Sequence, residues 1–194
     1  MVIPSGQDHP LLIKSVKTKR GVIDVDKKFI ADEEDWLRGL TFRLDNRSGK
    51  TVTFVEILLT FWRAEDQVPG IPAGWPLRKG PDPFSITEFL GVPPQMEPVA
   101  PGREIEVVLS DLEYDEIKRF LRDVQFPNAI KKMEIEVVKI GFSDGSAWNV
   151  GVMYRRDPKN TNGPLKGWSP EKKIEMDNLN LLHLAVLEIA LPFF

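Results

Sequence analysis

The chain has 194 residues, of which 42% are hydrophobic and 28% charged, and its formal net charge is −3. This size fits one large domain, or one domain with an appendage, of ordinary globular composition. The acidic balance argues against nucleic acid as a partner, and the absence of cysteine excludes disulfides, thiolate nucleophiles and cysteine-ligated metal centres.

The beginning of the chain carries no visible targeting signal. Residues 1–10 are polar and contain proline, with no basic region followed by an apolar core, so no signal peptide is predicted in this chain. No apolar run approaches the roughly 18 to 20 residues that span a bilayer, so no transmembrane span is predicted. We expect residues 11–16 and 22–25 to form a first hairpin.

The strongest pattern lies in residues 40–62, where two alternating runs flank the turn formers of residues 46–50. Alternation of apolar and polar side chains is the period of a half-buried strand. We therefore expect the two runs to pair as an antiparallel hairpin with one face in a core. The alternating apolar residues are Leu40, Phe42, Leu44, Val55, Ile57, Leu59 and Phe61.

Nine of the 16 prolines fall between residues 65 and 101. Because proline cannot donate to a strand ladder, this stretch is predicted to be a long irregular connection and not a central strand. Long loops of this kind are often functional.

The second half of the chain again has regular patterns. Residues 103–109 alternate as a strand, and the capping box Ser110/Glu113 predicts one helix over about residues 111–124. Residues 133–142 and 147–155 are predicted to form a hairpin around Asp144-Gly145, with a type I′ turn.

The last part of the chain, residues 171–194, is rich in leucine and has few charges. At helical spacing its apolar residues would cover most of a helix circumference. Such a segment needs a partner surface, so we expect this apolar C-terminal appendage to bind a protein partner or a second copy of the chain.

Two motifs, NRSGKTV at residues 46–52 and FSDGSAW at residues 142–148, resemble those of immunoglobulin-like β-sandwich domains in exported bacterial proteins. More narrowly, the chain is similar to an uncharacterised bacterial family with a late FxDGxxW hairpin and a following Arg-Arg-Asp-Pro, here residues 155–158. The resemblance covers about residues 11–170. It implies a single antiparallel β-sandwich domain and an extracytoplasmic location, periplasmic or secreted, and it carries no catalytic residue.

Catalytic and metal-binding patterns are weak. The carboxylate pairs Asp24/Asp26, Glu104/Glu106 and Glu134/Glu136 could flank a substrate, but each alternates with apolar residues and reads as the solvent face of a one-sided sheet. The acidic run at residues 32–35 lacks the spacing of a calcium loop. We predict no catalytic residue, no metal and no cofactor.

Aromatic side chains in the proline-rich connection form the most suggestive cluster, because exposed aromatics on loops often bind partners. They could equally cover a sheet edge or a sandwich end. The candidate binding residues are Trp75, Arg78, Phe84 and Phe89, with Lys79 beside them, and Trp168 from a later loop.

The sequence thus favours a non-catalytic binding or structural module of the bacterial cell envelope. One alternative is a carbohydrate-binding module that uses Trp62, Trp75 and Trp168 as stacking platforms. A second alternative is a carboxylate-based hydrolase.

Overall fold

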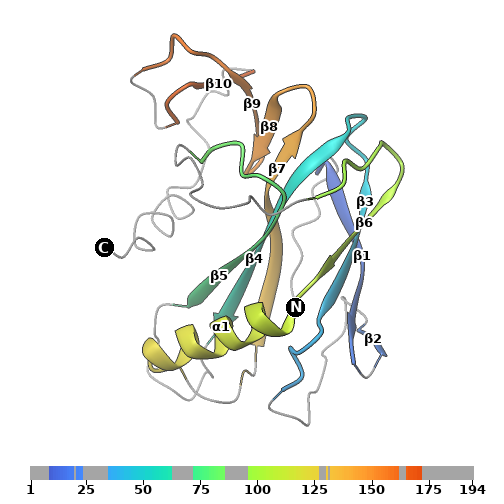
Figure 1. Ribbon diagram of the computed structural model, residues 1–194, viewed down its shortest axis with the longest axis vertical. Coiled ribbons are helices and arrows are strands. Elements are labelled where there is room, and N and C mark those ends of the chain that lie inside the picture. Colours follow the sequence, from blue (N-terminus) through green and yellow to red (C-terminus); the bar gives the residue numbers. More distant parts are fainter. Residues whose placement is uncertain are drawn as a thin grey trace.

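A computed structural model shows two antiparallel β-sheets packed face to face, with one helix in the described part of the chain (Figure 1). This confirms the predicted mainly β fold. The described residues are 9–19, 21–23, 35–62, 72–85, 96–126, 130, 132–161 and 165–171. The predicted C-terminal appendage therefore lies, except for Glu171, outside the described residues.

The first sheet consists of β1 (Leu11–Thr18), β2 (Gly21–Ile23), β3 (Thr41–Asn46) and β6 (Glu104–Val108). The order of these strands in the sheet is β2-β1-β3-β6. The hairpin β1–β2 confirms the first predicted hairpin, because Val16 pairs with Ile23 and Thr18 with Gly21.

The second sheet has six strands in the order β10-β9-β8-β7-β4-β5. Its two long strands, β4 and β7, lie side by side at the centre of the lower part of Figure 1. Its strands are β4 (Val52–Trp62), β5 (Ala73–Lys79), β7 (Lys132–Phe142), β8 (Ser146–Asn149), β9 (Val152–Arg156) and β10 (Trp168–Pro170).

The predicted hairpin of residues 40–62 is wrong in its pairing. β3 pairs with β1 and β6, whereas β4 pairs with β5 and β7, so the two strands lie in different sheets. Their apolar faces meet across the core, where Phe42, Leu59 and Phe61 are fully buried. The alternation of apolar residues predicted the correct buried face of each strand. It does so because a strand shows the same period of two whether the other strand lies in its own sheet or in the facing sheet.

Asn46 holds the corner between the two sheets and is 1% exposed. Its side-chain amide donates to the carbonyl oxygens of Lys50 (2.9 Å) and Val99 (3.0 Å), and its side-chain oxygen accepts from the Ser48 hydroxyl (2.7 Å). A buried polar side chain is stable only when such partners are present. The N-x-S-G-K turn is thus a structural corner.

The helix α1 (Asp111–Asp123) confirms the predicted helix and its capping box at Ser110 and Glu113. It buries Tyr114, Ile117 and Leu121 in the core, and it connects β6 of one sheet to β7 of the other. In Figure 1 it lies across one end of the sandwich. It is too short to span a membrane.

The helix ends in a Schellman motif. The Phe126 amide donates to the Leu121 carbonyl (2.7 Å), and the Gln125 amide donates to the Arg122 carbonyl (2.9 Å). Gln125 occupies the left-handed position, with φ 54°, that glycine usually fills.

The predicted late hairpin exists as β7–β8, but its turn is not of type I′. Gly141 pairs with Ala147, and Gly145, with φ 78°, is the residue of this loop that has positive φ. The loop therefore has three residues and a left-handed glycine at its end.

The second predicted run of this hairpin, residues 147–155, is not one strand. It breaks at Val150 and Gly151, where Asn149 pairs with Val152 in the further hairpin β8–β9. Both turn residues have positive φ, 44° and 86°, so the type I′ geometry occurs here. Valine is unusual at such a position because its branched Cβ crowds the backbone.

The proline-rich connection also differs from the prediction, because it contains the strand β5. Pro76 lies within this strand opposite Leu58, and β5 forms an edge of the six-stranded sheet. An edge strand tolerates proline, since the missing N–H can face solvent. The prediction that residues 65–101 form no central strand is therefore confirmed for the described part of this connection.

The longer strands make up the framework of the two sheets. β1, β3 and β6 form one sheet, and β5, β4, β7 and β8 form the other. The small strands β2, β9 and β10 extend this framework at its edges.

Candidate binding surface

Of the five candidate binding residues, the structure brings Phe84 and Trp168 together. Their ring centroids are 4.7 Å apart on the outer face of the six-stranded sheet. Trp75 faces the opposite way and packs on Phe120 of α1, with 5.4 Å between ring centroids. Phe89 lies outside the described residues.

Phe84 and Trp168 belong to a small cluster, which we call the outer aromatic cluster, made of Phe54, Phe84, Tyr154 and Trp168. Phe54 is fully buried although it is not part of the main core, and Trp168 is 6% exposed. The ring of Phe84 also meets that of Tyr154, with centroids 5.8 Å apart. Residues 81–85 thus cover the outer face of the sheet.

Small residues make room for this cover. A Cβ on Gly141 would lie 3.0 Å from Phe54 Cβ and 3.2 Å from Pro83 Cγ, closer than side chains normally approach. Ala147, which pairs with Gly141, is fully buried. The trough over these two small residues is what allows Pro83 to pack directly on the sheet.

Arg78 lies next to this cluster in an ion-pair network with Glu56, Lys139 and Asp82, which we call the Glu56 network. Arg78 Nε donates to Glu56 Oε2 (2.6 Å), and Lys139 Nζ lies 3.1 Å from Glu56 Oε1. Lys139 also reaches Asp82 Oδ2 at 3.8 Å. Asp82 in turn accepts from the Phe84 amide (2.9 Å), so the network is continuous with the outer aromatic cluster.

Glu56 is the residue of this network that the sequence analysis did not find. It is 5% exposed and lies on the outer side of β4, between Arg78 on β5 and Lys139 on β7. A charged group at this depth needs such partners. Its only signal in the sequence is that it interrupts the apolar run TFVEILLTF.

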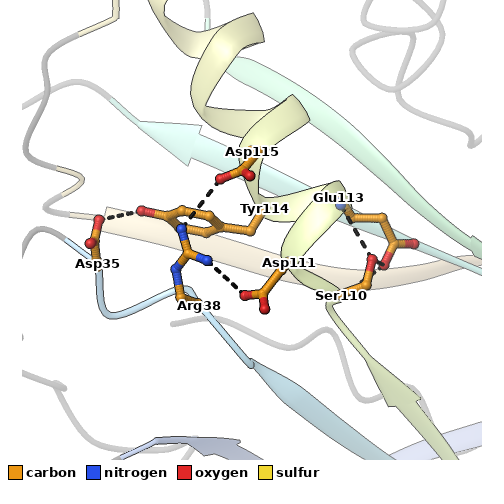
Figure 2. Close-up of polar contacts among 7 residues, drawn as sticks. All are labelled: Asp35, Arg38, Ser110, Asp111, Glu113, Tyr114 and Asp115. Atoms are coloured by element: carbon orange, nitrogen blue, oxygen red, sulfur yellow. Dashed lines mark hydrogen bonds and ion pairs between the residues drawn. The ribbon is translucent and has the colours of Figure 1, made fainter.

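A second polar cluster joins α1 to the turn before β3 (Figure 2). The Tyr114 hydroxyl donates to Asp35, and the Arg38 guanidinium lies 4.3 Å from the centre of the Tyr114 ring. Arg38 also bonds Asp111 (2.8 Å) and Asp115 (3.3 Å) on α1. Burial, together with the hydrogen bond to Asp35, raises the pKa of Tyr114 to about 12. This cluster anchors the helix.

The two motifs that carry the bacterial resemblance touch each other. Lys50 of the first motif bonds the Ser146 hydroxyl (2.8 Å) and Asp144 (3.0 Å) of the second, and its Nζ lies over the Phe142 ring. Burial would raise the pKa of Asp144, but hydrogen bonds from Ser146 and the charge of Lys50 outweigh it and lower that pKa to about 2. The contact joins the sandwich corner to the late hairpin.

The two carboxylate pairs that the structure describes lie on the outer faces of the sheets. Glu104 pairs with Lys14 and Glu106 with Arg43 (3.3 Å), both on the outer side of the four-stranded sheet. Glu134 and Glu136 are half-buried on β7, and the pair Asp24/Asp26 lies outside the described residues.

The three tryptophans proposed as stacking platforms do not form one surface. Trp75 and Trp168 lie on opposite faces of the six-stranded sheet. By alternation Trp62 shares the outer face with Phe54, but the two lie eight residues apart on β4, which is roughly 26 Å at the rise of a strand.

Within the described ranges, no three His, Asp or Glu side chains gather closely enough to hold a metal ion. Comparisons with protein-family models, with curated proteins and with solved structures gave no match to this chain.

Proposed function

We propose that the protein is a non-catalytic binding or structural module of the bacterial cell envelope, built on an immunoglobulin-like sandwich. The proposal combines the motif resemblance with the way the fold uses its charged side chains. A partner or a second copy would bind through the C-terminal segment beyond residue 171, which is too apolar to remain in water alone.

The observation that supports a non-catalytic role is the direction of the carboxyl pKa values. A general acid needs a carboxyl whose pKa is raised towards neutrality by burial or by a second carboxylate. Two carboxyl groups in the described part, Glu104 and Asp144, have a pKa that is lowered instead. The hydrogen bond from Lys14 lowers the first, and Ser146 with Lys50 lowers the second.

The candidate binding residues also have structural partners. Phe84 and Trp168 cover the outer face of a sheet, Trp75 packs on α1, and Arg78 pairs with Glu56. The outer aromatic cluster is still available to a partner at its rim, because Phe84 and Tyr154 are only half-buried and Arg156 stands over the Trp168 ring at 5.3 Å. A binding surface here would be rigid.

Cell fractionation and affinity capture test this proposal together. The full chain is detected in the envelope and cytoplasmic fractions of its native bacterium, and the immobilised chain is exposed to equal amounts of both. We expect the protein in the envelope fraction and one partner enriched from that fraction. A chain ending at Glu171 is the matched control and should lose that partner.

Two results would overturn the proposal. One is a protein found in the cytoplasm with no partner from the envelope. The other is glycosidic turnover by the purified chain that disappears when Glu134 or Glu136 is replaced by glutamine.

A further inference from the structure

Four strands end the two sheets in the described part of the chain, and they differ in how well their outer edges are protected. β2 and β10 have three residues each, and proline occurs within β5 and β10. β6 has five residues and no proline, and among the described residues no strand pairs with its outer edge. Short length and proline are two of the devices that block strand addition at an edge, and β6 has neither. It does carry the exposed charges of Glu104 and Glu106, which would repel an acidic strand and favour a basic one.

The backbone of β6 therefore offers unpaired groups. Its pairing with β3 runs from Thr41–Val108 to Asp45–Glu104 and uses one edge only. On the other edge, alternate N–H and C=O groups point away from the sheet without a partner strand among the described residues. Such a row is the template that an added strand requires.

The side chains of β6 decide which strand would fit. Ile105 and Val107 are buried, whereas Glu104 and Glu106 stand on the outer face with side chains 47% and 54% exposed. Their cations, Lys14 and Arg43, come from β1 and β3 on the inner side of the edge. A carboxylate can accept about four hydrogen bonds, so each retains acceptor capacity towards the open side.

Two exposed apolar side chains lie close to this edge along the chain. Val108, the last residue of β6, is 41% exposed, and Leu112 in the first turn of α1 is 71% exposed. These are two of the four large hydrophobic side chains that are exposed in the described part. Val108 itself lies on the open edge, so an apolar residue of an added strand could cover it.

We propose that the β6 edge is a strand-addition site for an extended peptide segment in which Lys or Arg alternates with apolar residues. This proposal rests on the proposed binding role and adds to it a second binding surface, distinct from the C-terminal segment, with its own class of partner. In an antiparallel register, the basic residues lie opposite Glu104 and Glu106, and an apolar residue lies opposite Val108. A second copy of β6 fits less well, because a pairing centred on the strand sets Glu106 against its own equivalent.

The test uses the blocked heptapeptide TVVRIKT, whose arginine and lysine would face Glu106 and Glu104. Binding to the full chain is measured by calorimetry at low salt, and amide hydrogen exchange locates the site. We expect binding with protection of β6 amides. Glu106→Lys should weaken binding at least about tenfold, and the peptide TVVEIKT, in which only the residue opposite position 106 is reversed in charge, should bind that variant at least about tenfold better than TVVRIKT does. The control Asp123→Lys, at the far end of α1, should leave binding unchanged.

Several outcomes would overturn the β6 site. They are no binding of TVVRIKT at millimolar concentration, equal binding of a peptide with N-methylated alternate amides, or protection elsewhere than β6. Protection of β6 in the concentrated chain without peptide would assign the edge to a second copy. If Glu106→Lys binds TVVRIKT as well as wild type does while wild type still captures an envelope partner, the binding role stands and the β6 site fails.

Discussion

Replacing Glu56 by glutamine should destabilise the protein, because Glu56 holds the ion-pair network on the outer face of the six-stranded sheet. The carboxylate is 5% exposed and faces two cations. Glutamine keeps the shape but presents an amide N–H₂ to one of these cations. The two positive side chains would then lie close together without the negative charge between them.

The size of the effect follows from the two bonds. Hydrogen bonds to charged groups contribute about 1.5–3 kcal/mol each. Arg78 is 48% exposed, so solvent screens its bond, whereas Lys139 is 19% exposed and is screened less. Glutamine avoids the desolvation cost of a carboxylate and can keep one acceptor. We expect a net loss of about 2–4 kcal/mol in the free energy of unfolding.

The loss in the free energy of unfolding is measured by urea unfolding of four proteins. These are the wild type, Glu56→Gln, Lys139→Met and the double variant. The control is Glu136→Gln. Glu136 lies on the same face of β7 as Lys139 but is half-buried, so this substitution should change the free energy of unfolding by less than about 0.5 kcal/mol. The two sites should couple by more than about 0.5 kcal/mol, because they share a bond. The buried network would be refuted if Glu56→Gln lost less than about 0.5 kcal/mol and the effects of Glu56→Gln and Lys139→Met simply added in the double variant.

Four further predictions follow. Leu59→Ala should cost roughly 2–5 kcal/mol in a denaturant melt, because Leu59 is fully buried in the core, and a loss below about 1 kcal/mol would contradict the register. Val150→Asn should stabilise the protein by about 1 kcal/mol, because asparagine tolerates positive φ, and a lower thermal midpoint would contradict this. The pKa of Asp144, lowered from 3.8 to about 2, gives stability that is present above pH 4 and lost as the pH falls towards 2, and Lys50→Met should flatten this acid limb of the stability profile. Light scattering should show a larger species for the full chain than for a chain lacking residues 172–194; two monomers, with the shorter one unfolded, would place that segment in the core.

The helix and most strands could be predicted because their signals are local. The capping box at Ser110 specifies the start of α1 through contacts within four residues. Alternation fixed the buried faces of β3, β4 and β6, since the side-chain period of a strand does not depend on its partner. The strand β5 was missed because Pro76 is incompatible with a central strand but not with an edge.

The sequence by itself determined the mainly β class, the helix that follows Ser110 and the set of residues that face the core in the described strands. Only the tertiary structure decided that β3 and β4 lie in opposite sheets, because identical alternation serves both a hairpin and two facing sheets. It also decided that Glu56 is buried and that Phe84 covers a sheet, since both depend on residues far apart in the chain. Long-range pairing and burial are set by the sum of all contacts, and no local pattern in the sequence encodes them.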